Sequence, residues 1–188
     1  MTLVAPEGDW IQTFTRQAFD VQNFREGHIR LEDIAHALSH ICRFSGHTDE
    51  FYSVAQHALM VSYLCAPEDA KFGLLHDATE AYIGDLATPI KKLIPEYKQY
   101  EIDLWAVIAR RFDLPVKSPA SVKQADILAL HWEANNLFAR GPMFRWAPDP
   151  TSEQMQNVPK TLFTSLPPIA AKALFLERYT EVRDDHID

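Results

Sequence analysis

Apolar residues recur every three to four positions along most of this chain, the spacing that places them on one face of an α-helix. The first such run contains Leu31, Ile34, Leu38 and Ile41, and it ends before Gly46. The 188 residues include six glycines, and no long stretch alternates apolar with polar residues. We therefore expect an all-α protein, a single-domain helical bundle in which strands are few or absent.

Prolines and glycines divide the rest of the chain into further elements. Pro67 suits the first turn of a helix, and Gly84 suits the residue after its last turn. Four prolines between Pro142 and Pro159 predict a surface loop or lid. The pattern predicts helices over 31–41, 52–64, 67–83, 104–112 and 119–137. We assign residues 1–188 to one domain, with a core at about 31–138, a loop or lid at 141–160 and a C-terminal helix at 165–183.

Charge and composition exclude several classes of function. The formal net charge of -8 argues against a surface that binds nucleic-acid phosphates. No window approaches the roughly 18 apolar residues of a membrane span, and the N-terminus has no basic stretch that leads into an apolar run. Cys42 and Cys65 are too few for a disulfide framework. We expect a cytoplasmic protein that binds neither a membrane nor a nucleic-acid polymer.

Polar residues occupy several positions at which the helical pattern calls for apolar ones. These residues are His57, the adjacent pair His76 and Asp77, and Asp126, on three separate predicted helices. A buried charge is costly unless it is paired or bound to a metal. A single histidine of this kind is usually a hydrogen-bonded core residue, but two imidazoles and two carboxylates together form a ligand set for a divalent metal. Mn, Co, Fe, Mg and Zn are the candidates.

Two further carboxylates are expected near these ligands. Glu80 follows Asp77 by three residues, so a helix places both on one face. Asp85 follows the expected helix stop at Gly84, where a loop can bring it over the same site. Both are candidates for general acid or base catalysis.

Two cations and an aromatic ring are candidates for substrate binding. Arg43 offers a forked, permanently charged donor that matches phosphate oxygens. Lys123 stands three residues before Asp126 and can bring a positive charge beside the metal. Phe44 offers an apolar face for a base or sugar.

The order and spacing of these motifs resemble the HD-domain metal-dependent phosphohydrolases. After His57, the segments HDATE at 76–80, GDLATPIK at 84–91 and VKQAD at 122–126 are similar to the branch of YfbR-type 5'-deoxynucleotidases. The resemblance covers roughly 34–137, and it is specific because several separate motifs agree.

The resemblance implies an HD-type helical bundle and assigns roles to the candidate residues. It makes His57, His76, Asp77 and Asp126 the metal ligands, Glu80 and Asp85 the catalytic carboxylates, and Arg43 and Lys123 the phosphate contacts. The implied reaction is removal of phosphate from deoxynucleoside 5'-monophosphates by metal-activated water, and relatives of this type are often homo-oligomers. Where the branch has tryptophan beside the sugar, this sequence has Phe44, which leaves the selectivity for deoxyribose open.

Two alternatives share the same ligand set. A deoxynucleoside triphosphate triphosphohydrolase, including a phage-type enzyme directed at dATP, would release tripolyphosphate and needs more positive charge, for which Arg140 or Arg145 is available. A catalytically silent nucleotide-binding module would keep the scaffold without turnover, and the intact pair of Glu80 and Asp85 argues against it.

Overall fold

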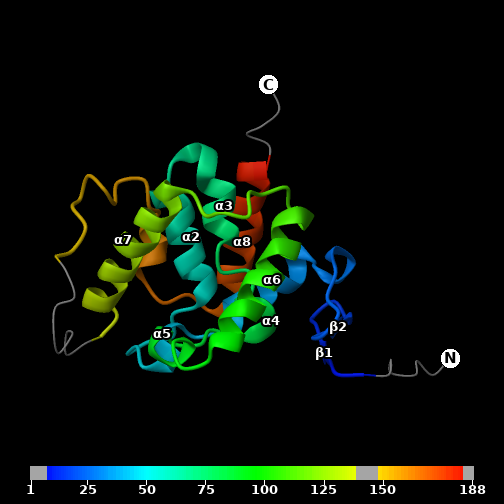
Figure 1. Ribbon diagram of the computed structural model, residues 1–188. Coiled ribbons are helices and arrows are strands. Elements are labelled where there is room, and N and C mark those ends of the chain that lie inside the picture. The colour runs from blue at the N-terminus through cyan, green and yellow to red at the C-terminus, as the bar shows by residue number, and fades with distance from the viewer. Residues whose placement is uncertain (1–7, 139–147, 184–188) are drawn as a thin grey trace.

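The computed structural model describes residues 8–138 and 148–183, and Figure 1 shows that helices form most of it. The prediction of an all-α protein is confirmed. The helices are α1 Leu31–His40, α2 Val54–Leu64, α3 Ala70–Leu75, α4 Glu80–Ile83, α5 Thr88–Lys91, α6 Pro95–Arg111, α7 Ala120–Asn136 and α8 Pro168–Arg183. Short 3-10 turns cover Glu26–His28, Arg43–Gly46, Pro67–Asp69 and Lys160–Phe163.

Two short strands, β1 Trp10–Gln12 and β2 Ala18–Asp20, form an antiparallel hairpin at the edge of the helices (Figure 1). Ile11 pairs with Phe19 in their register. Phe19 is fully buried and stacks on Tyr82 of α4, with ring centroids 4.5 Å apart. One apolar anchor thus holds the hairpin against the helical core.

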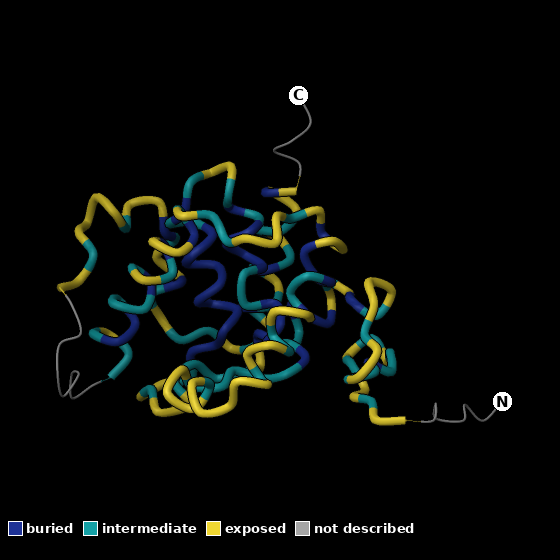
Figure 2. Tube along the Cα trace, in the orientation of Figure 1, coloured by how far each residue is buried: buried dark blue, intermediate teal, exposed yellow. Residues whose placement is uncertain are grey.

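Helix α2 is the centre of the core, and its trace is dark blue in Figure 2. Nine consecutive residues from Val54 to Ser62 are buried, because α1, α3, α7 and α8 all pack against this helix. Its start is fixed by a capping box, in which Ser53 accepts a hydrogen bond from the Gln56 amide while the Gln56 side chain accepts one from the Ser53 amide. A helix that neighbours surround on all sides holds its side chains in fixed positions, including any that bind a metal.

The expectation of one continuous helix over 67–83 was wrong. The segment divides into the turn Pro67–Asp69, α3, the turn 76–79 and α4. Across the second break the hydrogen bonds span three residues instead of four, from the Ala78 amide to Leu75 and from the Glu80 amide to Asp77. The tighter turn places His76 and Asp77 between two helices instead of within one.

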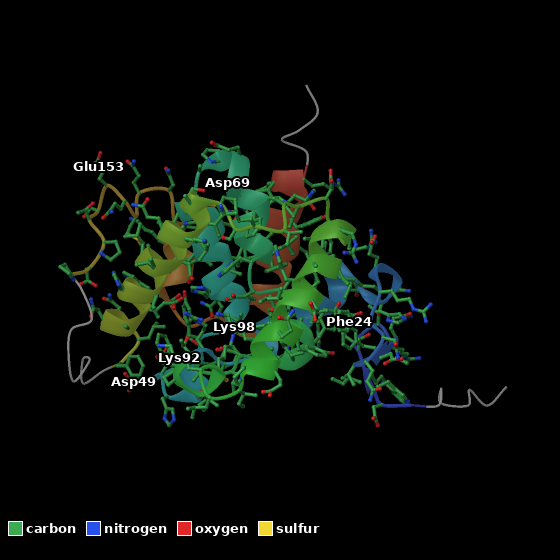
Figure 3. The ribbon with its side chains drawn as sticks, viewed as in Figure 1. Phe24, Asp49, Asp69, Lys92, Lys98 and Glu153 are labelled. Carbon is green, nitrogen blue, oxygen red and sulfur yellow. The ribbon has the colours of Figure 1, made fainter. Side chains whose placement is uncertain are left out.

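The ends of other helices also differ from the predictions. α6 begins at Pro95 instead of at 104, and its first half was not predicted because that half is charged and lacks the apolar periodicity of the second half. α7 begins at Ala120. Its start is tied to the start of α3 by a hydrogen bond from Ser121 to Asp69, which is labelled in Figure 3. Of the expected lid at 141–160, residues 141–147 lie outside the described residues, as do Arg140 and Arg145.

A membrane span requires a longer and more apolar helix than any found in 8–138 and 148–183. The buried apolar side chains of these residues form one cluster, to which α1, α2, α3, α6, α7 and α8 all contribute.

Candidate metal centre

The predicted metal ligands converge from three separate parts of the chain. His57 lies on α2, His76 and Asp77 lie in the turn after α3, and Asp126 lies on α7. One ligand atom from each of His57, His76 and Asp126 can be chosen so that all lie within 4.8 Å of one another. The Oδ2 atom of Asp77 is 3.3 Å from His76 Nε2 and 3.7 Å from His57 Nε2. Packing of α2 against α3 and α7 produces this convergence.

Both imidazoles present a buried ring nitrogen that has no hydrogen-bond partner among the described residues. These atoms are His57 Nε2 and His76 Nε2. The other ring nitrogens are engaged, since His57 Nδ1 donates to Glu133 Oε1 at 2.8 Å and His76 Nδ1 donates to the Gly73 carbonyl at 2.7 Å. Metal-bound histidines typically have this arrangement. The cluster of His57, His76 and Asp126 therefore fits a divalent metal ion, with nitrogen and oxygen ligands only.

The charges around the cluster shift the pKa values of its members. Burial and the Arg43 guanidinium favour a neutral His57, but the carboxylates of Glu133 and Asp126 outweigh them and raise its pKa to about 10. Burial would raise the pKa of Asp126, but the two imidazoles hold it well below its usual range. The surroundings of His57 thus favour positive charge at the position of the cluster.

Glu80 and Asp85 lie in the same charged cluster. Glu80 begins α4 and is 5% exposed, and its Oε2 has no hydrogen-bond partner among the described residues. Burial and the neighbouring carboxylates of Asp77 and Asp85 raise the pKa of Glu80 well above its usual value. Burial raises the pKa of Asp85, the charge of Arg43 lowers it and the charge of Asp77 raises it, and the pKa stays above its usual value. Raised carboxyl pKa values suit groups that exchange protons near neutral pH.

Arg43 lies within the cluster and is held by a buried acid. Its Nη2 donates to Glu133 Oε2 at 2.8 Å, whereas its Nε has no hydrogen-bond partner among the described residues. Burial acts against its charge, but Glu133 and Asp77 raise its pKa. Its charge also acts on Asp85. The guanidinium is therefore permanently charged and faces the carboxylates of the site.

Phe44 follows Arg43 in a strained turn. Its φ of 51° lies in the left-handed region, which L residues rarely adopt. The ring is half-buried and meets Phe138 edge to face, with centroids 5.3 Å apart. The backbone is fixed just before this turn, where the Arg43 amide donates to the Tyr52 carbonyl at 2.8 Å. Such strain is typical of functional sites.

Lys123 lies on α7, three residues before the cluster residue Asp126. Lys123 is exposed on α7, and within the described residues no ion pair joins it to another side chain. The lysine that lies beside Glu80 is Lys91 at the end of α5, whose Nζ is 3.4 Å from Glu80 Oε1 and 2.7 Å from Glu101 Oε1.

No protein-family model matches the chain. It is similar to the uncharacterized protein YfdR of Escherichia coli K12, with 37% identity over 178 residues that cover 93% of this chain and 96% of that protein. The chain belongs to the YfdR family. An uncharacterized protein of Rhodobacter capsulatus is 36% identical over 126 residues, which cover 62% of this chain and 64% of that protein. Neither relative's name states an activity.

In this member of the YfdR family, sequence reasoning missed Glu133 and Lys91. Glu133 follows Asp126 by seven residues, two helical turns, so both lie on one face of α7. The apolar neighbours Ala125 and Ala129 mark that face as buried. A glutamate at such a position was the signal for a second buried acid. Burial would raise the pKa of Glu133, but Arg43 and His57 outweigh it and hold the pKa below its usual value.

Proposed function

We propose that this protein is a divalent-metal-dependent HD-type phosphohydrolase that removes phosphate from deoxynucleoside 5'-monophosphates. The observation that carries the proposal is the convergence of His57, His76 and Asp126, in which neither Nε2 atom has a hydrogen-bond partner among the residues that the structure describes. Asp77 serves as the fourth ligand. The order of the motifs in the sequence supports the HD type.

When bound, a divalent metal supplies positive charge that stabilises phosphoryl oxygens and makes water more acidic. The remaining work belongs to side chains of this chain. Glu80, buried and with a raised pKa, accepts a proton from the attacking water. Asp85 supplies a proton to the leaving 5' oxygen. The donors of Arg43 that Glu133 does not use bind and orient the phosphate.

We infer a monophosphate from the cations of the described residues, which do not include Arg140 and Arg145. Among the described residues near the ligands, Arg43 is paired with Glu133, and Lys91 is paired with Glu80 and Glu101. A triphosphate needs further cations to balance its additional negative charge. We propose that Phe44, beside Arg43, contacts the sugar and restricts ribose at that position.

Product analysis tests this function. The purified protein is incubated with Mn²⁺ or Co²⁺ and with each deoxynucleoside mono- and triphosphate and its ribose counterpart. We expect inorganic phosphate from 5'-deoxynucleoside monophosphates and none after Glu80→Gln. Tripolyphosphate from triphosphates would support the triphosphohydrolase instead. Nucleotide binding without any product would support the silent binding module.

A further inference from the structure

We infer that Glu133 is a positioning residue that fixes the metal ligand His57 and the phosphate-binding Arg43 in one arrangement. The roles of its two partners rest on the proposed function. The contacts of Glu133 do not depend on it.

Each oxygen of the Glu133 carboxylate is committed to a different partner. Oε1 accepts from His57 Nδ1 at 2.8 Å, and Oε2 accepts from Arg43 Nη2 at 2.8 Å. These partners lie 76 and 90 residues earlier in the chain, on α2 and in the turn Arg43–Gly46. Because the carboxylate is planar and both oxygens are used, it cannot rotate without breaking one of the two bonds.

The contacts of Glu133 indicate a role through its partners. Its side chain is fully buried, and Oε1 is bonded to His57 Nδ1 instead of to the Nε2 atom that faces the ligand cluster. Both of its oxygens are already engaged, so we assign it no direct contact with a substrate. What it can do is act through its partners, which do face the cluster.

For His57, the bond to Glu133 determines which nitrogen is available to a metal. A proton on Nδ1 that is donated to a carboxylate leaves the Nε2 lone pair directed at Asp77 and Asp126. His76 is held by a neutral backbone carbonyl instead. His57 is therefore the ligand whose basicity and orientation depend on a charged side chain.

For Arg43, the same carboxylate sets the plane of the guanidinium. One N–H of Nη2 donates to Glu133, and this bond fixes the directions of the other guanidinium N–H groups. Without Glu133, Arg43 could pair with Asp77 or Asp85, whose charges already raise its pKa. A single substitution should thus weaken both metal and phosphate binding.

The variant Glu133→Gln tests this inference, because the amide keeps the shape and removes the charge. Calorimetric titration with Mn²⁺ should show a dissociation constant raised by about 10- to 100-fold, the usual effect of losing a partner of a metal-bound histidine. At saturating Mn²⁺, orthophosphate should also bind more weakly. Circular dichroism and urea unfolding of the metal-free variant establish that it is folded.

The matched control is Asp33→Asn. Asp33 is another buried carboxylate, 3% exposed, and it accepts two hydrogen bonds, from the amide and the hydroxyl of Thr15. We expect this variant to lose stability while it keeps the wild-type affinity for Mn²⁺. A folded Glu133→Gln protein with wild-type affinity for Mn²⁺ and orthophosphate would overturn the inference and leave Glu133 a purely structural residue.

A second measurement needs no variant and covers the case in which Glu133→Gln does not fold. Heteronuclear NMR of the imidazole nitrogens in the Zn²⁺-loaded wild-type protein should show His57 protonated at Nδ1. Protonation at Nε2 with the metal on Nδ1 would overturn the inference. If Glu133→Gln weakens Mn²⁺ binding but no nucleotide yields phosphate, the proposed function fails and the positioning role stands.

Discussion

The ammonium group of Lys91 lies 3.4 Å from Glu80 Oε1, at the edge of the ligand cluster. Burial, Asp77 and Asp85 raise the pKa of Glu80, and Lys91, followed by Arg43, opposes them. It is also held by Glu101 at 2.7 Å, so its position is fixed from two sides. Lys91 therefore helps to limit the rise in the pKa of Glu80.

Replacing Lys91 with methionine should move the acidic limb of the activity profile to higher pH. Without the cation the pKa of Glu80 rises further, so the deprotonated carboxylate is present only at higher pH. The control is Lys92→Met, since Lys92, labelled in Figure 3, is the exposed neighbour. Initial rates against pH give the comparison, and identical profiles for Lys91→Met and wild type would contradict the prediction.

Removing the metal should lower the melting temperature as well as the activity. An ion that binds only the folded state adds about 2.7 kcal/mol at a hundred times its dissociation constant. Thermal unfolding with Mn²⁺ and with a chelator measures the difference. In Asp126→Asn the difference should largely vanish, and an equal metal effect in that variant would show that the ion binds elsewhere.

Substituting Gly73 with alanine should destabilise the fold and the site together. A Cβ there would lie 2.9 Å from Cys65 Sγ and 3.2 Å from the Ser62 Cα atom. Overpacking of this kind costs about 1–3 kcal/mol, and the Gly73 carbonyl also holds His76. Urea unfolding measures the loss. The double variant with Cys65→Ala should recover only part of it, because the Ser62 backbone remains; full recovery would mean that the sulfur alone causes the clash.

The buried thiol of Cys65 should make stability depend on pH in the alkaline range. Burial, and next the charge of Asp69, raises the pKa of Cys65 to about 11. The resulting stabilisation is fully present below the unfolded pKa of about 8.5 and is lost as the pH rises towards the folded value. Urea unfolding of wild type and Cys65→Ala should therefore differ more at about pH 7 than at about pH 10. A difference that grows with pH would contradict this sign.

Much of the fold was predictable because its helices carry apolar periodicity. α1 and α2 were expected within two residues of their observed bounds, and the all-α class followed from the same pattern. The first half of α6 was missed because it is charged and exposed and so lacks that signal. The break at 76–79 was missed because His76 and Asp77 are compatible with a helix. The hydrogen bond from the His76 ring to the Gly73 carbonyl leaves no pattern in the sequence.

The site was predictable where its residues contradict their surroundings. His57, His76 and Asp126 are polar residues on faces that should be apolar, and the structure brings them together. Glu133 was missed because a glutamate on a helix is usually exposed. Its burial depends on Arg43, which lies 90 residues earlier. Lys91 was missed because spacing within one helix favoured Lys123, whereas the fold brings Lys91, at the end of α5, to Glu80 at the start of α4.

The central claim is that metal bound at His57, His76 and Asp126 is required for phosphate release from a deoxynucleoside 5'-monophosphate. The most direct measurement adds Mn²⁺ stepwise to metal-free protein and follows occupancy by calorimetry and phosphate release in parallel. We expect the rate of phosphate release to rise in proportion to metal occupancy. We expect Asp126→Asn to show neither metal binding nor phosphate release. Full phosphate release by the metal-free protein, or none at full occupancy, would contradict it.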